Sequence, residues 1–402
     1  MQIEALSLSN FRIFTRLEMD FPDRLTLLVG NNAQGKTSVL EAVHFLSILT
    51  SPLASNDREL INLLTVQDEL PVGRLVGRVR KQEKTHTIEV RLILNTIQNG
   101  NQRLRKEVLI NGVKKRLFDA VGFFNSVLFL PQMTRILEDG PDERRKYLDQ
   151  LLSQAYPGYV RALSEYQQAL TRRNALLKLL FDRNGDPAQL DYWDDILTSN
   201  GALIIEARLK STREFEVFFG QQYRRLTDGK EEMRMDYQPS YNGVRAKNEQ
   251  PEMEITARPP ELLHYEEIKA HFTKRLRALQ KEEIRRGVTT IGPHRDEVRF
   301  YSNDVDLAVY GSRGQIRTAV MAMKIAETQW LQEKTGELPV LLLDETLAEL
   351  DEQRREDLLG SLGLEEQAIL TTTDLGLFSE DFVRTCQIWR VNAGQVERLN
   401  SH

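Results

Sequence analysis

Residues 25–37 read LTLLVGNNAQGKT, a short apolar run followed by a glycine-rich loop. The apolar run, Leu25 to Val29, predicts a buried strand. Gly30 and Gly35 allow a tight turn in which backbone N–H groups face phosphate oxygens. The residues that would offer these groups are Asn31, Asn32, Ala33 and Gln34. The stretch therefore predicts a phosphate-binding loop in an α/β fold.

The end of this loop carries the chemistry of a nucleotide site. Lys36 supplies a cation for the β- and γ-phosphates of ATP, and Thr37 supplies a hydroxyl for Mg²⁺. From Ser38 the sequence SVLEAVHFLSIL has helical spacing, which places the phosphates at a helix N-terminus. The strand before and the helix after distinguish the loop from a chance match in an ordinary turn. ATP and Mg²⁺ are therefore the expected cofactors.

A second half of the site lies near the far end of the sequence, in LPVLLLDETLAELD at residues 338–351. Val340 to Leu343 is a continuous apolar run, typical of a strand covered on both faces. Asp344 ends that strand, where its carboxylate can hold Mg²⁺. Glu345 is placed to polarise an attacking water. Beside a phosphate-binding loop these acids favour hydrolysis over a plain strand end at the surface, with Glu345 and Lys36 as catalytic residues.

A third motif, GSRGQ at Gly311 to Gln315, lies between the two half-sites. Glycine and serine are common in any loop, but here a helix-like run, IRTAVMAMKIAETQWLQ, follows directly. Ser312 and Gly314 therefore stand where backbone N–H groups can cap an anion.

The composition is that of a large globular chain with no general affinity for nucleic acid. The 402 residues, 41% of them hydrophobic, suggest about two to three domains with ample cores. The formal net charge of −5 means that any DNA contact must rest on local basic patches. The single cysteine, Cys386, suits a reducing cytoplasm. No apolar run approaches ~18 residues and the N-terminus has no signal-peptide layout, so we expect a cytoplasmic protein without a membrane span.

Changes of pattern divide the chain into three parts. Residues 1–120 alternate short strands with one strong helix, and Asn111-Gly112 marks a hairpin turn. The pattern of residues 121–287 is helical and has leucines at heptad spacing. Proline and glycine residues interrupt this pattern, which argues against a long coiled coil. Strands resume near Val298, so residues 288–402 are expected to complete the first part.

Basic residues cluster in two places, on the expected hairpin and in the helical part. The first group is Arg103, Arg105, Lys106, Lys114, Lys115 and Arg116; the second is Arg172, Arg173, Arg224, Arg225, Lys274, Arg275, Arg277 and Lys281 to Arg286. A charged run is usually a solvated face, and acids lie close to several of these runs. The sequence therefore assigns no single run to DNA.

Seven stretches together carry a resemblance to a known family. They are LSLSNFRIF (6–14), LLVGNNAQGKTSVLEAV (27–43), VLFLPQMTRILEDGPDERRKYLD (127–149), IGPHRDEV (291–298), YGSRGQIRTAVMAMKIAE (310–327), LLLDETLAELD (341–351) and TTTD (371–374). In this order they resemble the RecF family of bacterial recombination-mediator ATPases, which belongs with the SMC-type, ABC-like heads. The resemblance implies an α/β, ABC-type P-loop ATPase head, split in sequence by an arm-like helical lobe.

The resemblance assigns further residues within one chain. It implies that Arg12 contacts nucleotide phosphate, as an arginine at this position does in related heads. It places Gln132 near Mg²⁺, together with Thr37 and Asp344. It makes Asp374 a switch residue near the γ-phosphate.

Other residues are implied to act on the ATP of a second chain. GSRGQ resembles the signature motif, so Ser312, Gly314 and Gln315 would cover ATP bound by a partner. Glu349-Leu350-Asp351 resembles the D-loop of the dimer interface, which adds Asp351 to the ATP-binding residues.

The sequence departs from the family pattern at three points. Ile316 replaces the second Gln of the usual signature, and Pro131-Gln132-Met133 stands where Pro-Glu-Asp is frequent. Glu345 replaces the usual Asp after the Mg²⁺-binding Asp344. The change at Glu345 bears on the rate of ATP hydrolysis and leaves the assignment to this class of ATPase unaffected.

The function implied is an ATP-dependent DNA-binding protein of recombinational repair and replication. Two chains would bind ATP·Mg²⁺, close head to tail, and clamp DNA at gaps or single-strand/double-strand junctions. Slow, DNA-stimulated hydrolysis would reopen the homodimer, which would help to load recombinase with RecO- and RecR-like partners. A transporter ATPase subunit and a nucleotide-switched head that scarcely hydrolyses remain alternatives. The sequence assigns no chemistry to His294 in IGPHRD.

Overall fold

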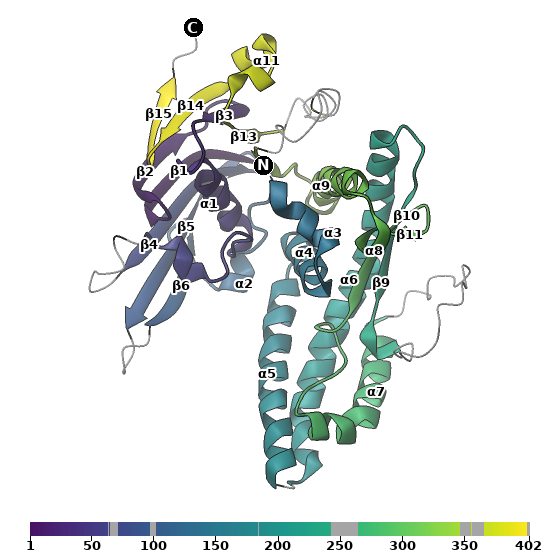
Figure 1. Cartoon of the computed structure of the whole chain (residues 1–402). Helices are drawn as coiled ribbons and strands as arrows, with labels where there is room; N and C mark the ends of the chain where they lie inside the picture. Colours follow the sequence, from purple (N-terminus) through teal and green to yellow (C-terminus); the bar gives the residue numbers. More distant parts are fainter. Residues whose placement is uncertain are drawn as a thin grey trace. The chain divides into compact units, whose positions relative to one another are not determined.

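The computed structural model describes residues 1–62, 64, 71–96, 102–183, 185–242, 264–345, 355 and 366–399. The chain forms two compact units, one of residues 1–134 with 321–402 and one of residues 135–320. Figure 1 colours the chain from its N-terminus to its C-terminus, and both ends belong to the first unit.

The first unit contains two six-stranded sheets. One is antiparallel and has the order β2 (Phe14–Asp20), β1 (Gln2–Phe11), β4 (Val72–Lys81), β5 (Lys84–Thr96), β6 (Gln102–Ile110) and β7 (Val113–Lys115). The other has the order β15 (Gln395–Leu399), β14 (Gln387–Asn392), β3 (Leu25–Val29), β13 (Ala368–Thr372), β12 (Val340–Asp344) and β8 (Ser126–Phe129). All strands of this second sheet are parallel except β15. The apolar runs predicted as buried strands are thus its central members.

Helix α1 (Lys36–Ile48) joins the two sheets into one core. Its apolar side chains, among them Val39, Leu40, Val43 and Phe45, are fully buried with residues of both sheets. Short elements complete the unit: η1 (Asp57–Leu60), α2 (Leu117–Ala120), η3 (Pro131–Thr134), η7 (Leu375–Leu377) and α11 (Glu380–Arg384). The core therefore extends over both strand layers and fixes α1 behind the glycine-rich loop.

The predicted hairpin turn is confirmed between β6 and β7. Ile110 pairs with Val113, and both Asn111 and Gly112 have positive φ, 52° and 76°. This is the backbone that an Asn-Gly pair favours, since it matches the twist of the two strands.

The second unit is mostly helical. It contains α3 (Arg135–Glu138), α4 (Pro141–Ala155), α5 (Tyr159–Arg183), η4 (Pro187–Leu190), α6 (Asp191–Leu226), η5 (Ser240–Asn242), α7 (Tyr265–Arg286) and α8 (Leu307–Tyr310). Helices α5, α6 and α7 lie side by side, and a three-stranded sheet of β11 (Val305–Asp306), β10 (Glu297–Ser302) and β9 (Met233–Gln238) lies beside α6. Helix α9 (Arg313–Thr335) begins in this unit and continues into the first.

The units do not follow the breaks suggested by sequence at residues 120 and 287. Strand β10 was expected to continue the first part, but it pairs antiparallel with β9, with Val298 opposite Tyr237. The helical segment therefore supplies a strand partner for β10, and the signature motif falls in the second unit.

Two basic positions named as DNA candidates are internal. Arg173 is fully buried on α5, where it pairs with Asp194 at 2.6 Å and with Glu283 at 2.7 Å. Lys106 on β6 pairs with Asp57 at 2.5 Å and has a side chain only 16% exposed. For both residues the interpretation as exposed basic surface is wrong, because each is held by carboxylates inside its unit.

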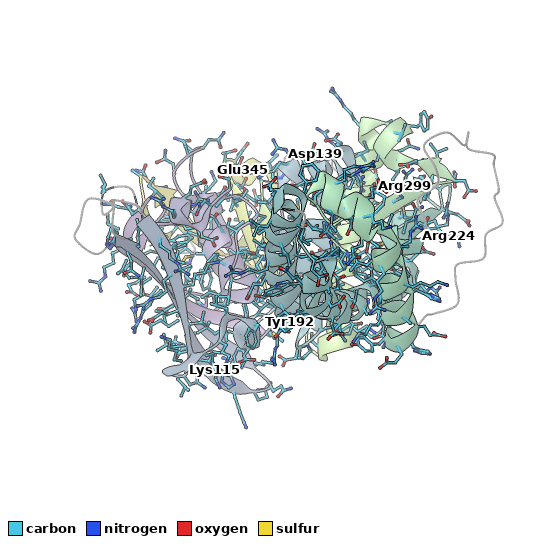
Figure 2. The ribbon with its side chains drawn as sticks, turned by 90° about the horizontal axis from the view of Figure 1, so that it is seen from below. Lys115, Asp139, Tyr192, Arg224, Arg299 and Glu345 are labelled. Carbon is cyan, nitrogen blue, oxygen red and sulfur yellow. The ribbon has the colours of Figure 1, made fainter. Side chains whose placement is uncertain are left out.

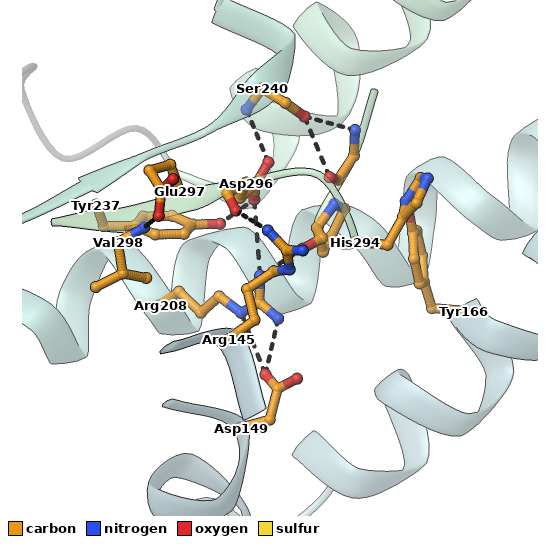
Figure 3. Close-up of polar contacts among 12 residues, drawn as sticks. Arg145, Asp149, Tyr166, Arg208, Tyr237, Ser240, His294, Asp296, Glu297 and Val298 are labelled. Carbon is orange, nitrogen blue, oxygen red and sulfur yellow. Dashed lines mark hydrogen bonds and ion pairs between the residues drawn. The ribbon is translucent and has the colours of Figure 1, made fainter. Parts of the chain in front are cut away.

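The IGPHRD segment crosses the buried centre of the second unit (Figure 3). Arg208 of α6 donates to the Pro293 carbonyl and to Asp149, each at 2.8 Å. Asp296, fully buried, accepts from the Ser240 backbone N–H at 2.7 Å and from the Tyr237 hydroxyl. The motif thus joins α4, α6 and β9 through charged groups that satisfy one another.

His294 belongs to the same structural arrangement. Its Nδ1 lies 2.6 Å from the Tyr166 hydroxyl, and its Nε2 lies 3.2 Å from the Thr289 carbonyl oxygen. Burial lowers the pKa of His294 to about 4. Both ring nitrogens therefore have structural partners, and the imidazole is neutral at pH 7.

Among the described residues, no helix has the length and apolar character needed to cross a membrane.

Candidate nucleotide site

The predicted site residues of the first unit meet at one edge of its parallel sheet. Strands β3, β13, β12 and β8 are neighbours in that order and run parallel. The glycine-rich loop follows β3, Asp344 ends β12, and Gln132 follows β8. In sheets of this kind, ligands bind at the carboxyl ends of the strands. The fold therefore gathers distant parts of the sequence where a ligand is expected.

Glycines allow the backbone path of the loop. A Cβ atom on Gly30 would lie 2.2 Å from the carbonyl oxygen of Val391, so only glycine fits there. Gly35 has φ of 109°, and a Cβ on it would lie 2.9 Å from Ile13. Helix α1 begins directly afterwards at Lys36. The loop thus ends at a helix N-terminus, whose free N–H groups attract anions.

Gln34 ties the loop to the neighbouring strand pair. Its Oε1 accepts from the backbone N–H of Ala393 at 2.6 Å, and its Nε2 donates to the Asn32 carbonyl at 3.3 Å. Its own carbonyl accepts from Gly394 N–H at 3.3 Å. The side chain of Gln34 is therefore occupied in holding the loop, which leaves backbone N–H groups for a ligand.

Lys36 is buried and has three oxygen partners. Its Nζ lies 2.7 Å from the Gly30 carbonyl, 2.9 Å from the Asn31 carbonyl and 2.9 Å from the Glu345 carboxylate. Only 3% of its surface is exposed. The structure thus brings together the two residues predicted to be catalytic.

Thr37 and Asp344 also meet, although they are 307 residues apart in sequence. The Thr37 hydroxyl lies 2.9 and 2.8 Å from the two carboxylate oxygens of Asp344. Burial raises the pKa of Asp344 above its usual value, against hydrogen bonds from Thr37 and Thr371 that lower it. A hydroxyl and a carboxylate are hard oxygen ligands, so this pair fits Mg²⁺.

Thr371 is a site residue that the sequence reasoning missed. Its hydroxyl donates to Asp344 at 2.8 Å and accepts from the backbone N–H of Glu345 at 2.9 Å. Glu345 has φ of 47°, an uncommon value for a residue other than glycine. Thr371 therefore orients both acids. Thr371 belongs to the TTTD stretch of the family resemblance, but the partner of a threonine on a neighbouring strand becomes visible only in three dimensions.

Arg12 lies near the loop but is held by a carboxylate of α1. Its Nε and NH2 groups donate to the two oxygens of Glu41 at 2.8 and 2.6 Å, and NH1 donates to the Glu59 carbonyl at 3.2 Å. This is the two-point geometry that makes arginine–carboxylate pairs strong. The guanidinium is thus held against the second turn of α1 by Glu41, a partner that the sequence did not suggest.

Two other predicted residues, Gln132 and Asp374, lie at short 3₁₀ helices of the first unit. Gln132 is exposed in η3, directly after β8. Asp374 caps the short helix η7, accepting from Gly376 N–H at 2.8 Å. Asp351 lies outside the described residues.

The signature motif forms the start of α9 in the second unit. The Ser312 hydroxyl accepts from Gln315 N–H at 3.2 Å, and the Gln315 side-chain oxygen accepts from Ser312 N–H at 3.1 Å. This reciprocal pair is a capping box, which fixes the first turn of a helix. Ser312 and Gly314 are exposed. GSRGQ is therefore an ordered helix N-terminus, open to an anion.

Comparisons with known proteins agree with this geometry. The model for the RecF/RecN/SMC N terminal domain matches residues 2–395. "DNA replication and repair protein RecF" of Chloroflexus aggregans is 35% identical, over 98% of this chain and 99% of the relative. Its namesake from Halalkalibacterium halodurans is 32% identical, over 99% of this chain and 100% of the relative.

Solved structures show the same fold. The recombination mediator protein RecF bound to ATP, from the RecFOR pathway, has a TM-score of 0.84 at 28% identity, over 99% of this chain and 97% of the other. An Smc head bound to the C-winged helix domain of ScpA has a TM-score of 0.50 at 14% identity, covering 99% and 97% of the two chains.

Fold and site together define a mixed α/β ATPase head of the SMC type with a long helical insertion. Within that class, the full-length relatives are decisive. The chain belongs to the RecF family of DNA replication and repair proteins.

Proposed function

We propose that this protein is an ATP-dependent recombination mediator that clamps DNA as a homodimer. Two chains bind ATP·Mg²⁺, close head to tail, and hold DNA at gaps or single-strand/double-strand junctions. Slow, DNA-stimulated hydrolysis reopens the dimer. In this cycle the protein acts in the cytoplasm with RecO- and RecR-like partners to load recombinase.

One observation carries the proposal: the meeting of Lys36 and Thr37 with Asp344 and Glu345 inside the first unit. A strand end with two acids has no reason to contact a glycine-rich loop unless both serve one ligand. The ATP-bound relative matches over nearly the whole chain, which supports ATP as that ligand.

Thr37 and Asp344 are the residues that would hold Mg²⁺, with Gln132 as a further ligand. The fit rests on the buried Asp344 carboxylate, whose oxygens lie beside the Thr37 hydroxyl, so that two hard oxygen ligands stand together at the end of β12. When bound, the ion supplies charge neutralisation for the β- and γ-phosphates. The backbone N–H groups from Asn31 to Gly35 and the Lys36 ammonium supply the rest of the phosphate site.

Glu345 serves as the general base for the attacking water. Its side chain is 32% exposed, so water can reach it, and Thr371 orients its backbone. Lys36 neutralises the same carboxylate at 2.9 Å. ATP phosphates would compete for the lysine, and the displaced carboxylate would then be available for proton transfer.

The second half of each ATP site comes from the other chain. Ser312, Gly314 and Gln315 present an ordered helix N-terminus, whose partial positive charge suits a γ-phosphate. Arg12 would contact nucleotide phosphate in its own chain, guided by Glu41, and Asp351 would complete the dimer interface.

The outer face of the antiparallel sheet offers a surface for DNA phosphates. Arg74 and Arg91 stand opposite each other on β4 and β5, 44% and 41% exposed, and share Glu89, which is only 14% exposed. Arg105 and Lys114 share Glu107 in the same manner. In each group two exposed cations share one less exposed carboxylate, so these two places carry local positive charge although the whole chain is acidic. Lys115 extends from the end of this sheet (Figure 2).

A mixing experiment tests the shared site. Ser312→Arg should block closure but leave ATP binding by the single chain intact, whereas Lys36→Ala should lose ATP binding. A mixture of the two chains contains dimers with one wild-type composite site, so hydrolysis should partly recover. Light scattering should show ATP-dependent dimers for wild type and none for Ser312→Arg alone. Full activity of monomeric Ser312→Arg would refute the head-to-tail dimer.

A further inference from the structure

A glutamate outside all the recognised motifs lies beneath the signature loop. The Glu231 carboxylate accepts from the Tyr223 hydroxyl at 2.5 Å and from the Ser302 hydroxyl at 2.6 Å. Its two oxygens also lie 3.4 and 3.3 Å from Nε2 of Gln315 in the signature. Tyr223 lies in the last turn of α6 and Ser302 ends β10, and both are buried. Glu231 is therefore fixed by the core of the second unit while it contacts the loop.

The contacts of Gln315 define its orientation. Its Oε1 accepts from the backbone N–H of Ser312 at 3.1 Å, and its Nε2 faces Glu231. A backbone N–H only donates and a carboxylate only accepts, so both partners require the same orientation of the amide. Both polar atoms of the Gln315 side chain are thus occupied, one by the loop and one by Glu231.

The charge of Glu231 also follows from its partners. Hydrogen bonds from Ser302, and then from Tyr223, hold the pKa of Glu231 below its usual value. The group is therefore a carboxylate at neutral pH. An acid beside a site for phosphate is unfavourable by charge alone, so its presence needs a structural reason.

We infer that Glu231 is the positioning residue of the signature loop. It holds Gln315, and through the capping box Ser312, in the geometry that aims the first N–H groups of α9 at an anion. The inference rests on the proposed function, in which that anion is the ATP of a second chain. Because Tyr223 belongs to the 36-residue helix α6, the loop takes its orientation from the arm-like helix.

Glu232 provides a matched control. It is the neighbouring glutamate, its side chain is 72% exposed, and it pairs with exposed Arg224 at the surface. Glu232→Ala removes the same number of atoms and the same charge as Glu231→Ala without touching Gln315.

Hydrogen exchange of the ATP-free protein tests the positioning directly. In Glu231→Ala the peptide covering residues 311–320 should exchange faster than in wild type, because the capping box loses its anchor. The peptide covering residues 30–40 should not change, nor should either peptide in Glu232→Ala. Unchanged exchange of residues 311–320 in folded Glu231→Ala would overturn the inference.

ATP-dependent dimerisation then tests whether the positioning matters. Glu231→Ala should bind ATP as wild type does but need about ten- to a hundredfold more protein to dimerise, as expected for a lost charged hydrogen bond. Glu231→Gln should restore assembly, since its amide oxygen can accept from Gln315 and the two hydroxyls can reorient. Wild-type assembly of Glu231→Ala, or failure of Glu231→Gln to rescue, would overturn the inference.

A second variant and a wild-type control complete the test. If Glu231→Ala does not fold, Tyr223→Phe replaces it, because it removes one donor and keeps the ring packed; it should shift exchange and assembly in the same direction by less. If wild type itself does not dimerise with ATP, the proposed function fails, while the exchange experiment still decides whether Glu231 positions the loop.

Discussion

Replacing Glu345 by glutamine separates the two roles that the structure gives this residue. In the described structure its carboxylate neutralises Lys36 at 2.9 Å, and in the proposed reaction it accepts a proton from water. Glutamine keeps the side-chain oxygen and the shape but removes the charge and the basicity. ATP should therefore bind more tightly, because the phosphates no longer compete with an anion for Lys36, while hydrolysis should nearly cease.

The expected change in ATP affinity follows from the exposure of the ion pair, and the expected change in hydrolysis follows from the loss of the base. Lys36 is 3% exposed, but Glu345 is 32% exposed, so solvent screens their attraction. A pair of this kind contributes about 1 kcal/mol or less, which corresponds to at most about fivefold in ATP affinity. Loss of a general base lowers the rate by roughly 10²- to 10⁴-fold. The effect on hydrolysis should thus exceed the effect on binding by far.

The assay pairs an equilibrium titration with a fluorescent ATP analogue and a single-turnover measurement of phosphate release. Glu380→Gln, a change at a side chain that is 91% exposed on α11, should leave both quantities at wild-type values. Hydrolysis by Glu345→Gln at the wild-type rate would show that Glu345 is not the base. Weaker ATP binding by this variant would show that the ion pair does not oppose the nucleotide.

Four further outcomes are expected. Asp344→Asn keeps the side-chain shape that contacts Thr37 and Thr371 but removes the negative charge. The Mg²⁺ concentration for half-maximal hydrolysis should therefore rise about ten- to a hundredfold. An unchanged Mg²⁺ titration would show that Asp344 does not bind the ion. DNA binding should weaken with salt at a log–log slope of ~0.9 per neutralised phosphate, and a double Arg74→Ala, Arg91→Ala variant should lower that slope by about two if both contact phosphates. Duplex binding should also be tighter with ATP than without, and equal affinities across the salt series would contradict the closed dimer. Burial, and then the charge of Lys324, lowers the pKa of His44 from 6.5 to about 3. The stability that neutral His44 contributes is therefore fully present above pH 6.5, the pKa in the unfolded chain. It is lost as pH falls from 6.5 towards 3, by ~1.4 kcal/mol per pH unit, because only the unfolded chain takes up the proton. His44→Asn should therefore show a shallower loss of stability between pH 6.5 and 4.5 in urea unfolding, and an equal slope would be evidence against a neutral buried His44.

The parts of the site that are continuous in sequence were predictable. The P-loop between β3 and α1, and Asp344 at the end of β12, each follow from local pattern, because strand burial and loop geometry are local properties. Their meeting could be inferred from chemistry, since a phosphate loop needs a Mg²⁺ carboxylate. The Asn111-Gly112 turn was predictable for the same local reason.

Pairings between distant residues were not predictable from one sequence. Thr371 on β13 reaches the two acids only because β13 lies next to β12. Arg173 resembled a solvated charge in a basic run of the helical part, yet Asp194 and Glu283 neutralise it inside the helical unit. Likewise β10 pairs with β9 rather than with the first unit. Each case depends on a partner whose proximity is created by the fold.

The charges gathered at the nucleotide site explain why bound ATP should favour dimer closure. Two cations, Lys36 and Arg12, are matched by Glu345 and Glu41, and Asp344 adds a third carboxylate. These five side chains therefore leave a net negative charge, to which a triphosphate would add several more. Mg²⁺, Lys36 and the N-terminus of α1 offset part of this charge within one chain, and a γ-phosphate at the open edge of the sheet can accept further positive partners. The ordered N-terminus of α9 in a second chain would supply them. On this argument dimer closure completes the phosphate site, so ATP that is already bound by one chain favours the meeting of two chains.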